Sequence, residues 1–496
     1  MPQKMRACAA LLIAVLLAQL AGPALAQRSD IRVGMQLEPP ILDPTAGAAA
    51  AIDEVTYANV FEGLTRFAPD GTVLPGLAKS WEVAPDGLSW VFYLREGVTF
   101  HDGTPFTAED VVFSFERAME DGSLNAQKQL FDGINSVIAL DDTSVEIGLD
   151  VPKASLLTNL AWGDMTIVSP ASADGNATNP IGTGPFVFSD WVQGDRVELE
   201  RNPGYWGDPP RLDKVTFKFI SEPTAASNAL MAGDIDAYPV FPAPESLVQF
   251  EADPRFSVII GTTEGETILA MNEGQSPFND IRVRAAIAHA IDRQAIIDGA
   301  MFGYGTPIGS HFPPHNPAFE DLTSLSAYDP DLARSLLAEA GYPDGFETTL
   351  TLPPPPYARR GGEIVAAQLR AVGITAEIIN LEWAQWLEQV FTNRNYGLTI
   401  VSHTEPMDIW IYARDDYYFG YRDPVMGALQ EGFDKTIDPG DQIALLQAAQ
   451  ERVASHYVNA FLFQLPKTGV ADARLRGLWA DSPTQANDMT AVYWEE

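Results

Sequence analysis

Few side chains in this sequence are placed to do chemistry. Histidines are the most versatile of them, and none pairs at the helical spacing that presents two ligands to one metal ion. His311 and His315 are four residues apart, but Pro313 and Pro314 between them exclude a helix. His101 is followed by Asp102 and Gly103, a combination typical of a turn. The other histidines are His289, His403 and His456. We therefore expect no metal site and no catalytic histidine.

The motifs of the common hydrolases are also missing. The sequence contains no G-x-S-x-G elbow, no H-E-x-x-H zinc motif and no phosphate-binding Walker loop. The single cysteine is Cys8, close to the amino terminus, and a secreted hydrolase would lack a thiol nucleophile. We expect a protein that is not an enzyme and that carries no cofactor.

The richest group of potential ligand-contacting side chains is the stretch Leu398 to Tyr421. It starts as an apolar strand and breaks at Glu405-Pro406, because proline cannot continue a central strand. Aromatic and charged residues follow the break, namely Asp408, Trp410, Tyr412, Arg414, Asp415, Asp416, Tyr417, Tyr418, Phe419 and Tyr421. Rings with polar tips beside fixed charges are typical of a ligand pocket. The alternative is that the rings pack beneath a long loop.

Regular elements must hold these residues in place. Residues 31–35 predict a strand and 52–61 a helix ended by Gly63, whereas 81–83 and 89–94 predict a hairpin around the turn Pro85-Asp86-Gly87. Thr107 caps the next predicted helix, with Asp110 at the capping-box position. Strands and helices alternate farther along, with strands at 349–352 and 375–381 and helices at 330–341, 362–372 and 441–457. This alternation predicts an α/β fold.

The amino terminus predicts export. Lys4 and Arg6 precede an apolar run over residues 7–21, and Ala24-Leu25-Ala26 is a small-residue cleavage site. We expect a cleaved signal peptide over residues 1–26 and a mature periplasmic chain that begins near Gln27. The formal net charge is −36 and becomes −38 without Lys4 and Arg6. This charge disfavours nucleic-acid partners and anionic membrane surfaces, and we expect no insertion into the membrane.

One uninterrupted segment carries a family resemblance. It includes Ser80-Trp81-Glu82-Val83, Leu94 to Val98, Phe100-His101-Asp102-Gly103 and Pro105 to Ser114. Similar fingerprints follow at Gly182-Thr183-Gly184-Pro185-Phe186, Arg201 to Trp206, Ala232 to Asp236 and Pro277 to Arg293. The chain closely resembles the extracytoplasmic solute-binding proteins of family 5, the peptide- and nickel-type binding components of ABC importers.

The resemblance implies a two-lobe periplasmic binding protein fold with an extra inserted subdomain in the first lobe. Two strands, near 267–271 and 461–470, would cross between the lobes as a hinge, the second interrupted by Pro466. The implied boundaries are 27–54 for the first part of lobe I, 55–183 for its inserted subdomain, 184–265 for its second part, 266–468 for lobe II and 469–496 for the return.

The residues that anchor peptides in this family are missing at two positions. Peptide-binding relatives hold the ligand's amino group with an aspartate where this chain has Ser402, and a neutral hydroxyl cannot replace a carboxylate. Dipeptide-binding relatives clamp the carboxylate with an arginine where this chain has Leu352 to Tyr357. Glu405 or Asp408 could supply the missing charge. The ligand-binding candidates are Pro40, Trp383, Ser402, His403, Glu405, Asp408, Trp410 and Tyr412, with Trp386 assigned to the core.

The resemblance implies the periplasmic component of an ABC importer, which captures a peptide or peptide-like solute and delivers it to a permease at the inner membrane. We expect a monomer. A non-peptide ligand on the same fold (an opine, an oligosaccharide or a metal chelate) remains open at this point, as does a chaperone for exported polypeptides.

Overall fold

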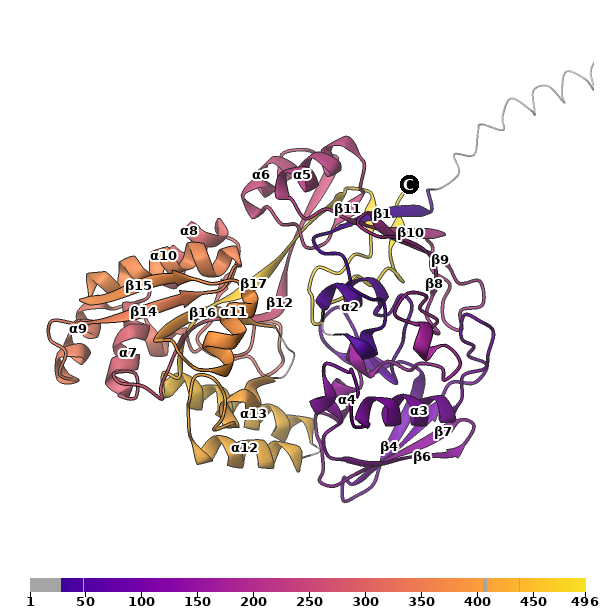
Figure 1. The fold of residues 1–496 in the computed structure, drawn as a ribbon, viewed down its shortest axis with the longest axis horizontal. Helices are drawn as coiled ribbons and strands as arrows, with labels where there is room; N and C mark the ends of the chain where they lie inside the picture. The colour runs from indigo at the N-terminus through magenta and orange to yellow at the C-terminus, as the bar shows by residue number, and fades with distance from the viewer. Residues whose placement is uncertain (1–27, 48, 405–407, 437) are drawn as a thin grey trace, which may run out of the picture.

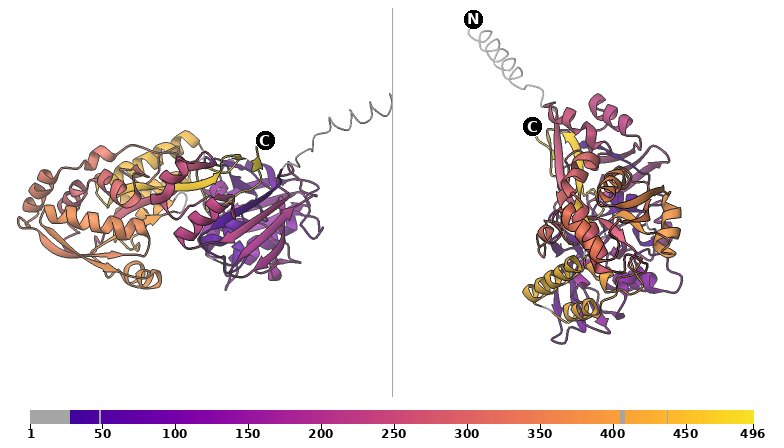
Figure 2. Two further views of the ribbon diagram at one scale, coloured as in Figure 1. Left: turned by 90° about the horizontal axis from the view of Figure 1, so that it is seen from above. Right: turned by 90° about the vertical axis from the view of Figure 1, so that its left-hand side faces the viewer.

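The structure is a computed structural model that describes residues 28–496 except 48, 405–407 and 437. The predicted signal peptide and the site candidate Glu405 lie outside these described residues. Within them, no helix combines the length and the apolar character needed to cross a membrane. Figure 1 shows two lobes, and Figure 2 shows from above that they lie side by side along the long axis.

Two long antiparallel strands join the lobes. β12 (Phe256–Met271) and β17 (Asn459–Asp472) lie at the centre of a sheet with the order β15-β14-β16-β12-β17-β11-β1-β10-β9-β8. Their register shifts between Thr262 and Glu266, where the chain passes from one lobe to the other. The predicted crossing strands are thereby confirmed. Pro466 does not interrupt β17, however. It lies opposite Thr262 at the edge of the irregularity, where a missing N–H is tolerated.

Lobe I carries the other half of this sheet. Its strands are β1 (Asp30–Met35), β8 (Phe186–Val192), β9 (Arg196–Arg201), β10 (Lys214–Phe219) and β11 (Ala237–Tyr238). The lobe also contains α5 (Pro223–Ala232), α6 (Leu247–Glu251) and the carboxyl-terminal pair β18 (Leu475–Arg476) and β19 (Tyr493–Trp494). Val33, Phe186, Phe217 and Trp494 belong to one buried cluster, so the two ends of the chain share a core.

The helix predicted for 52–61 is shorter than expected. α2 spans Ala50–Thr56, because Tyr57 is extended and Ala58 adopts a φ of 57°. Asn59 stabilises the turn that ends the helix, since its side-chain amide donates to the backbone oxygens of Val55 at 3.0 Å and Asn487 at 2.8 Å. The turn after α2 is therefore held by the distant carboxyl-terminal segment.

The inserted subdomain has its own sheet and core. The order β4-β5-β7-β6 is formed by β4 (Ala78–Val83), β5 (Ser89–Leu94), β6 (Ile134–Asp141) and β7 (Ser144–Leu149), beside the small pair β2 (Thr65–Phe67) and β3 (Val73–Pro75). α3 (Ala108–Met119) and α4 (Leu156–Asn159) complete it. The predicted hairpin is confirmed, and so is the capping box, in which Asp110 accepts from the backbone N–H of Thr107 at 2.8 Å.

Lobe II is an α/β unit, as the alternating pattern predicts. β14 (Phe346–Leu352) pairs in parallel with β15 (Ile374–Asn380) and β16 (Leu398–His403), and β13 (Thr306–Pro307) pairs with β17. Its helices are α7 (Ile281–Ala290), α8 (Arg293–Met301), α9 (Pro330–Glu339), α10 (Pro356–Ala371), α11 (Trp383–Trp386), α12 (Pro424–Asp434) and α13 (Pro439–Ser455). α10 begins six residues earlier than predicted, because Pro356 suits the first position of a helix.

Short turns connect these elements. They are 3₁₀ turns at Pro44–Ala46, Lys128–Phe131, Gly163–Met165, Ala173–Gly175, Pro244–Ser246, Thr323–Ser326 and Asp408–Ala413, and a π-helical segment at Leu387–Thr392. The turn at Asp408–Ala413 carries several of the predicted site residues out of β16.

Several buried carboxyl groups make the fold sensitive to pH. Burial raises the pKa of Glu62 to about 7, although Thr183, Tyr205 and Trp206 all donate hydrogen bonds to its carboxylate. Burial also raises the pKa of Asp164 to about 7 and that of Glu273 to about 8. The folded state therefore holds protons on these groups more tightly than the unfolded chain does.

We expect the free energy of unfolding to fall as the pH rises from 5 to 7.5. The stabilisation that comes from these raised pKa values is complete below the unfolded pKa values near 4 and is lost as the pH rises through the folded pKa values of about 7 to 8. Each group contributes no more than about 1.4 kcal/mol to the free energy of unfolding per unit by which its pKa is raised. Thermal unfolding at pH 5, 6 and 7.5 measures it. Glu62→Gln should flatten the dependence, whereas Glu347→Gln, an exposed carboxyl on β14, should not. Equal melting temperatures at pH 5 and 7.5 would contradict this expectation.

Candidate ligand-binding site

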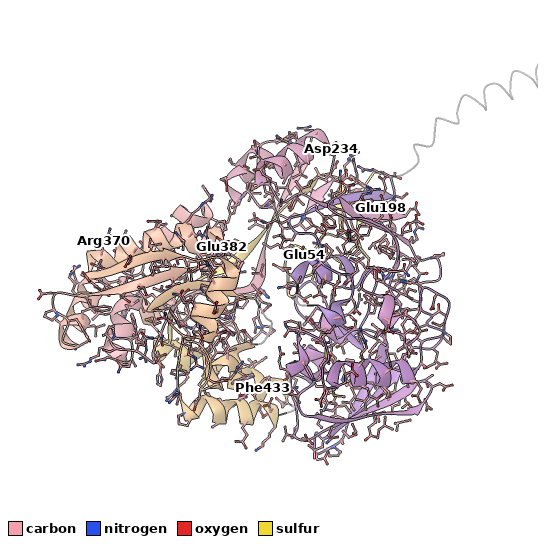
Figure 3. All side chains as sticks on the ribbon, viewed as in Figure 1. Glu54, Glu198, Asp234, Arg370, Glu382 and Phe433 are labelled. Carbon is pink, nitrogen blue, oxygen red and sulfur yellow. The ribbon has the colours of Figure 1, made fainter. Side chains whose placement is uncertain are left out.

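A cavity of about 300 Å³ lies between the inserted subdomain and lobe II. Phe433 of α12 is on its lobe II side, and Figure 3 places that side chain at the edge of lobe II that faces lobe I. The lining is mostly apolar, as in small-molecule sites. It includes Phe67, Val73, Ala154 and Thr158 from the subdomain and Pro317, Ala318, Phe433, Gln442, Ile443 and Leu446 from lobe II.

A carboxylate–imidazole pair at the crossing strands lines this cavity, which Asp70 of the subdomain also lines. Glu264 stands on β12 within the register shift between Thr262 and Glu266. Its Oε1 lies 2.5 Å from Nε2 of His315, and both residues line the cavity. The side chains are 9% and 14% exposed, so the pair is shielded but accessible from the cavity. Such a pair can bind a polar or charged group of a small solute.

A second cluster lies two residues farther along β12. Glu266 is fully buried, and its Oε1 is 3.2 Å from Nδ1 of His311. Nε2 of the same ring is 2.8 Å from Oδ1 of Asp408. Burial alone would lower the pKa of His311, but the two carboxylates outweigh it and raise that pKa to about 10. The His311 imidazole therefore places a positive charge between two negative ones.

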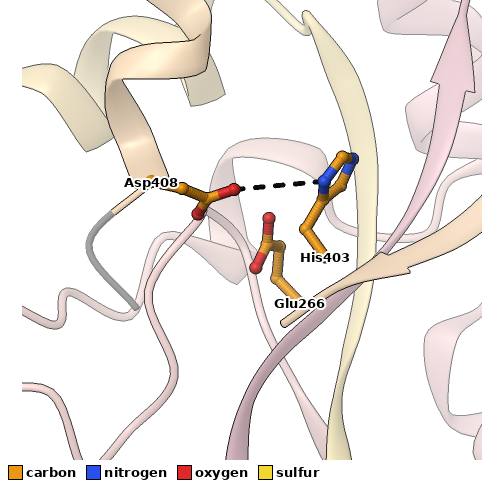
Figure 4. Close-up of side chains that lie close together, drawn as sticks. All are labelled: Glu266, His403 and Asp408. Carbon is orange, nitrogen blue, oxygen red and sulfur yellow. Dashed lines mark ion pairs between the residues drawn. The ribbon is translucent and has the colours of Figure 1, made fainter. Parts of the chain in front are cut away.

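His403 completes this cluster from the end of β16. It lies opposite Glu266 in the β12–β16 register. Its Nδ1 is 4.0 Å from Oδ2 of Asp408, and its Nε2 is 3.1 Å from the hydroxyl of Tyr418. Figure 4 shows the carboxylate of Glu266 beside this pair, with the three side chains facing one another. The two predicted candidates His403 and Asp408 thus come together.

The other predicted candidates lie in different surroundings. Trp383 is 42% exposed at the start of α11 and packs edge-on against Trp386 at 5.6 Å. Trp386 is buried and donates from Nε1 to Thr399, which agrees with its assignment to the core. The backbone N–H of Ser402 donates to the hydroxyl of Tyr357, and Pro40 is exposed after β1.

Two of the candidate rings pack within lobe II. Trp410 lies against Phe433 with ring centroids 5.3 Å apart, so it supports a side chain of the cavity wall. Tyr412 is 1% exposed, and its hydroxyl accepts a hydrogen bond from Asn459 at 3.1 Å. The ligand contacts assigned to these eight positions, including the undescribed Glu405, remain predictions.

Sequence reasoning missed the pairing of Glu264 and Glu266 with His315 and His311. The two glutamates are two residues apart on one strand. The two histidines lie in the proline-rich loop that was predicted not to form a helix. The loop is indeed non-helical, and this lets the two rings reach two different carboxylates. A Glu-x-Glu strand beside a His-x-x-x-His loop was the available signal, but only contact in space links its parts.

Comparison with known proteins decides the family. Residues 72–409 match the family of bacterial extracellular solute-binding proteins, family 5 (middle region). The chain belongs to this family. Family 5 relatives include heme-binding protein A of Haemophilus influenzae, which is 31% identical over 380 residues, 69% of each chain. The dipeptide-binding protein of Escherichia coli is 31% identical over 353 residues, which cover 64% of this chain and 65% of the relative.

Among solved structures of similar shape is DppA from Helicobacter pylori in complex with the peptide STSA. It has a TM-score of 0.78 and 25% sequence identity, and the match covers 95% of this chain and 99% of that one. The two-lobe periplasmic binding protein fold expected from the family 5 resemblance is thereby confirmed. The family's members are binding proteins.

Proposed function

We propose that this protein is the substrate-binding component of an ABC importer and that it captures a peptide or peptide-like solute between its lobes. The observation that carries the proposal is the inter-lobe cavity, which both lobes line and which Glu264 enters from a crossing strand. Membership of family 5 and the peptide named for the Helicobacter pylori structure support the same function. The proposed partner is a permease at the inner membrane, and the proposed location is the periplasm.

Ligand capture would use the two crossing strands as a hinge. Residues 263–265 lie between the two paired halves of β12 and β17, so rotation there breaks few ladder hydrogen bonds. We propose the lobe boundaries given above, with the inserted subdomain over 55–183 as the wall that faces α12 and α13. On this basis the protein carries its ligand as a monomer, without chemical change.

We infer that Glu264 replaces the family's missing amino-group anchor. Asp408 is the weaker candidate, because it is not among the residues that line the inter-lobe cavity. Glu264 instead lines the cavity. A charged hydrogen bond to an ammonium group contributes about 1.5–3 kcal/mol, and the cavity volume, at the lower end for small-molecule sites, favours a short peptide.

Glu264→Gln should weaken the binding of a short peptide at least about tenfold, which corresponds to about 1.4 kcal/mol. Isothermal titration calorimetry with the mature protein measures this change. Glu363→Gln, an exposed carboxyl on α10, is the matched control and should bind as the wild type does. Equal peptide affinities of the wild type and both variants would show that Glu264 does not anchor the ligand.

The ligand class is tested by a thermal-shift screen of the mature protein against di- to pentapeptides, opines, oligosaccharides and metal chelates. A ligand that binds only the folded state raises the melting temperature by mass action. We expect short peptides to give the largest rise and to be recovered uncleaved. A rise only with a non-peptide class would keep the importer and overturn the peptide ligand, whereas peptide turnover would overturn the carrier function.

A further inference from the structure

We propose that Glu266, His403 and Asp408 form a binding site for a divalent transition-metal ion of the zinc type. One carboxylate or imidazole atom from each residue lies within 4.8 Å of the other two. The three side chains come from β12, the end of β16 and the turn that follows it, and they face one another in Figure 4. The site is separate from the Glu264–His315 pair and does not depend on the proposed peptide ligand.

The three donor atoms must move closer together to hold an ion, since they are spread over distances of up to 4.8 Å. Bonds of about 2.1 Å in a tetrahedral zinc site place the donor atoms about 3.4 Å apart. Nδ1 of His403 is 4.0 Å from Oδ2 of Asp408. Rotation of the Asp408 side chain, which is 15% exposed and the least buried of the three, can close this difference. Three protein ligands and one open position are the arrangement of many zinc sites.

Two carboxylate oxygens of the cluster face one imidazole ring, that of His311, at 3.2 and 2.8 Å. Glu266 is 1% exposed, yet its Oε1 makes no hydrogen bond among the described residues, and the same holds for Oδ1 of Asp408. His311 lies close to both atoms, but its contacts lack hydrogen-bond geometry. Buried carboxylates without such partners are costly. A bound dication would take over the pairing of these two oxygens from the His311 ring.

The histidine is also held as a metal ligand usually is. Nε2 of His403 contacts the hydroxyl of Tyr418 at 3.1 Å, while Nδ1 lies 3.5 Å from the hydroxyl of Tyr417 and 4.0 Å from Oδ2 of Asp408. Ligating histidines commonly bond their second nitrogen in this way, which fixes the tautomer and the ring orientation. Tyr418 is buried, so the ring has little freedom to turn away.

The carboxylate oxygens and the imidazole nitrogen of this site favour some metal ions over others. Calcium and magnesium prefer sites made only of oxygen, whereas imidazole suits zinc and nickel. We therefore assign the site to a borderline divalent cation with nitrogen and oxygen ligands.

Calorimetric titration of tag-free, EDTA-treated mature protein with Zn²⁺ tests the site. We expect one ion per chain with micromolar or tighter affinity at pH 7.5, and a tetrahedral Co²⁺ absorption spectrum when cobalt is used. Asp408→Asn and His403→Gln should each weaken Zn²⁺ binding at least tenfold. The controls are Asp416→Asn and His456→Gln, an exposed aspartate and a histidine paired with Tyr421 outside the cluster, and they should bind as the wild type does.

Unfolding curves and circular dichroism of every variant separate lost binding from lost folding. The proposal is overturned if the folded wild type takes up no stoichiometric Zn²⁺, or if both cluster variants retain its affinity. Binding that Mg²⁺ or Ca²⁺ displaces equally well also overturns it. Glu264→Gln should keep Zn²⁺ binding while it loses peptide affinity, so failure of the metal site and failure of the peptide carrier give different results.

Discussion

Replacing Gly182 with alanine should destabilise the protein by about 3 kcal/mol, since overpacking against rigid surroundings has costs of this size. A Cβ atom at this position would lie 1.9 Å from the backbone oxygen of Val60 and 2.7 Å from its carbonyl carbon. The backbone cannot yield easily, because His101 N–H donates to the Gly182 oxygen at 2.9 Å and Gly184 N–H donates to Val60 at 3.0 Å.

Gly175→Ala is the matched control for this experiment. A Cβ at Gly175 meets no atom within 4 Å, and this glycine lies in the same connection between β7 and β8. Chemical denaturation of both variants measures the difference, and we expect the control to lie within about 1 kcal/mol of the wild type. Equal stability of the two variants would show that the close approach of Gly182 to Val60 relaxes without cost.

Asp236→Ala should destabilise lobe I by about 3 kcal/mol, the lower range found when one partner of a buried ion pair is removed. Asp236 is 5% exposed, and its carboxylate accepts from Arg28 at 2.9 and 2.7 Å. It also accepts from the side chain of Arg32 at 3.0 Å and from the backbone N–H of Arg32 at 2.9 Å. Its loss would leave the side chain and the backbone N–H of Arg32 without this acceptor, whereas Arg28 would keep its pair with Asp30.

Asp253→Ala provides the comparison. Asp253 pairs with Arg255, which is two residues away and 61% exposed, so its removal should change stability by less than about 1 kcal/mol. Urea unfolding followed by fluorescence measures both variants. Raised salt should reduce the small Asp253 effect and leave most of the Asp236 effect. A loss at Asp236 no greater than that at Asp253 would mean that this buried network adds little.

Contacts of Gly182 explain two short motifs in the sequence. The Gly182-Thr183-Gly184 fingerprint exists because the segment passes within contact of the Val60 and Asn59 backbone, where no Cβ fits. His101, which could suggest a catalytic pair with Asp102, instead accepts from the N–H of Gly182 and contacts the oxygen of Gly184 at 2.9 Å. Burial lowers the pKa of His101, in agreement with a neutral structural ring.

Local signals explain why much of the fold could be predicted. The hairpin around Gly87 and the helix capped by Thr107 depend on residues close in sequence. The end of α2 could not be predicted in this way, because Asn59 bonds Asn487, more than four hundred residues away. The continuation of β17 through Pro466 likewise depends on its partner Thr262 at the register shift.

The sequence by itself determined the family, the α/β character, the crossing strands and the segment that carries His403 at the end of β16 and Asp408 after it. Those features arise from short-range patterns and from motifs that survive as continuous strings. Only the tertiary structure decided which charges meet. Glu264 and Glu266, His311 and His315, and Asp408 belong to three separate segments, brought together by the pairing of β12 with β16 and by a loop that prolines keep from becoming a helix. Contacts between such distant segments follow no characteristic spacing in the sequence, because the fold alone sets the distances between their side chains.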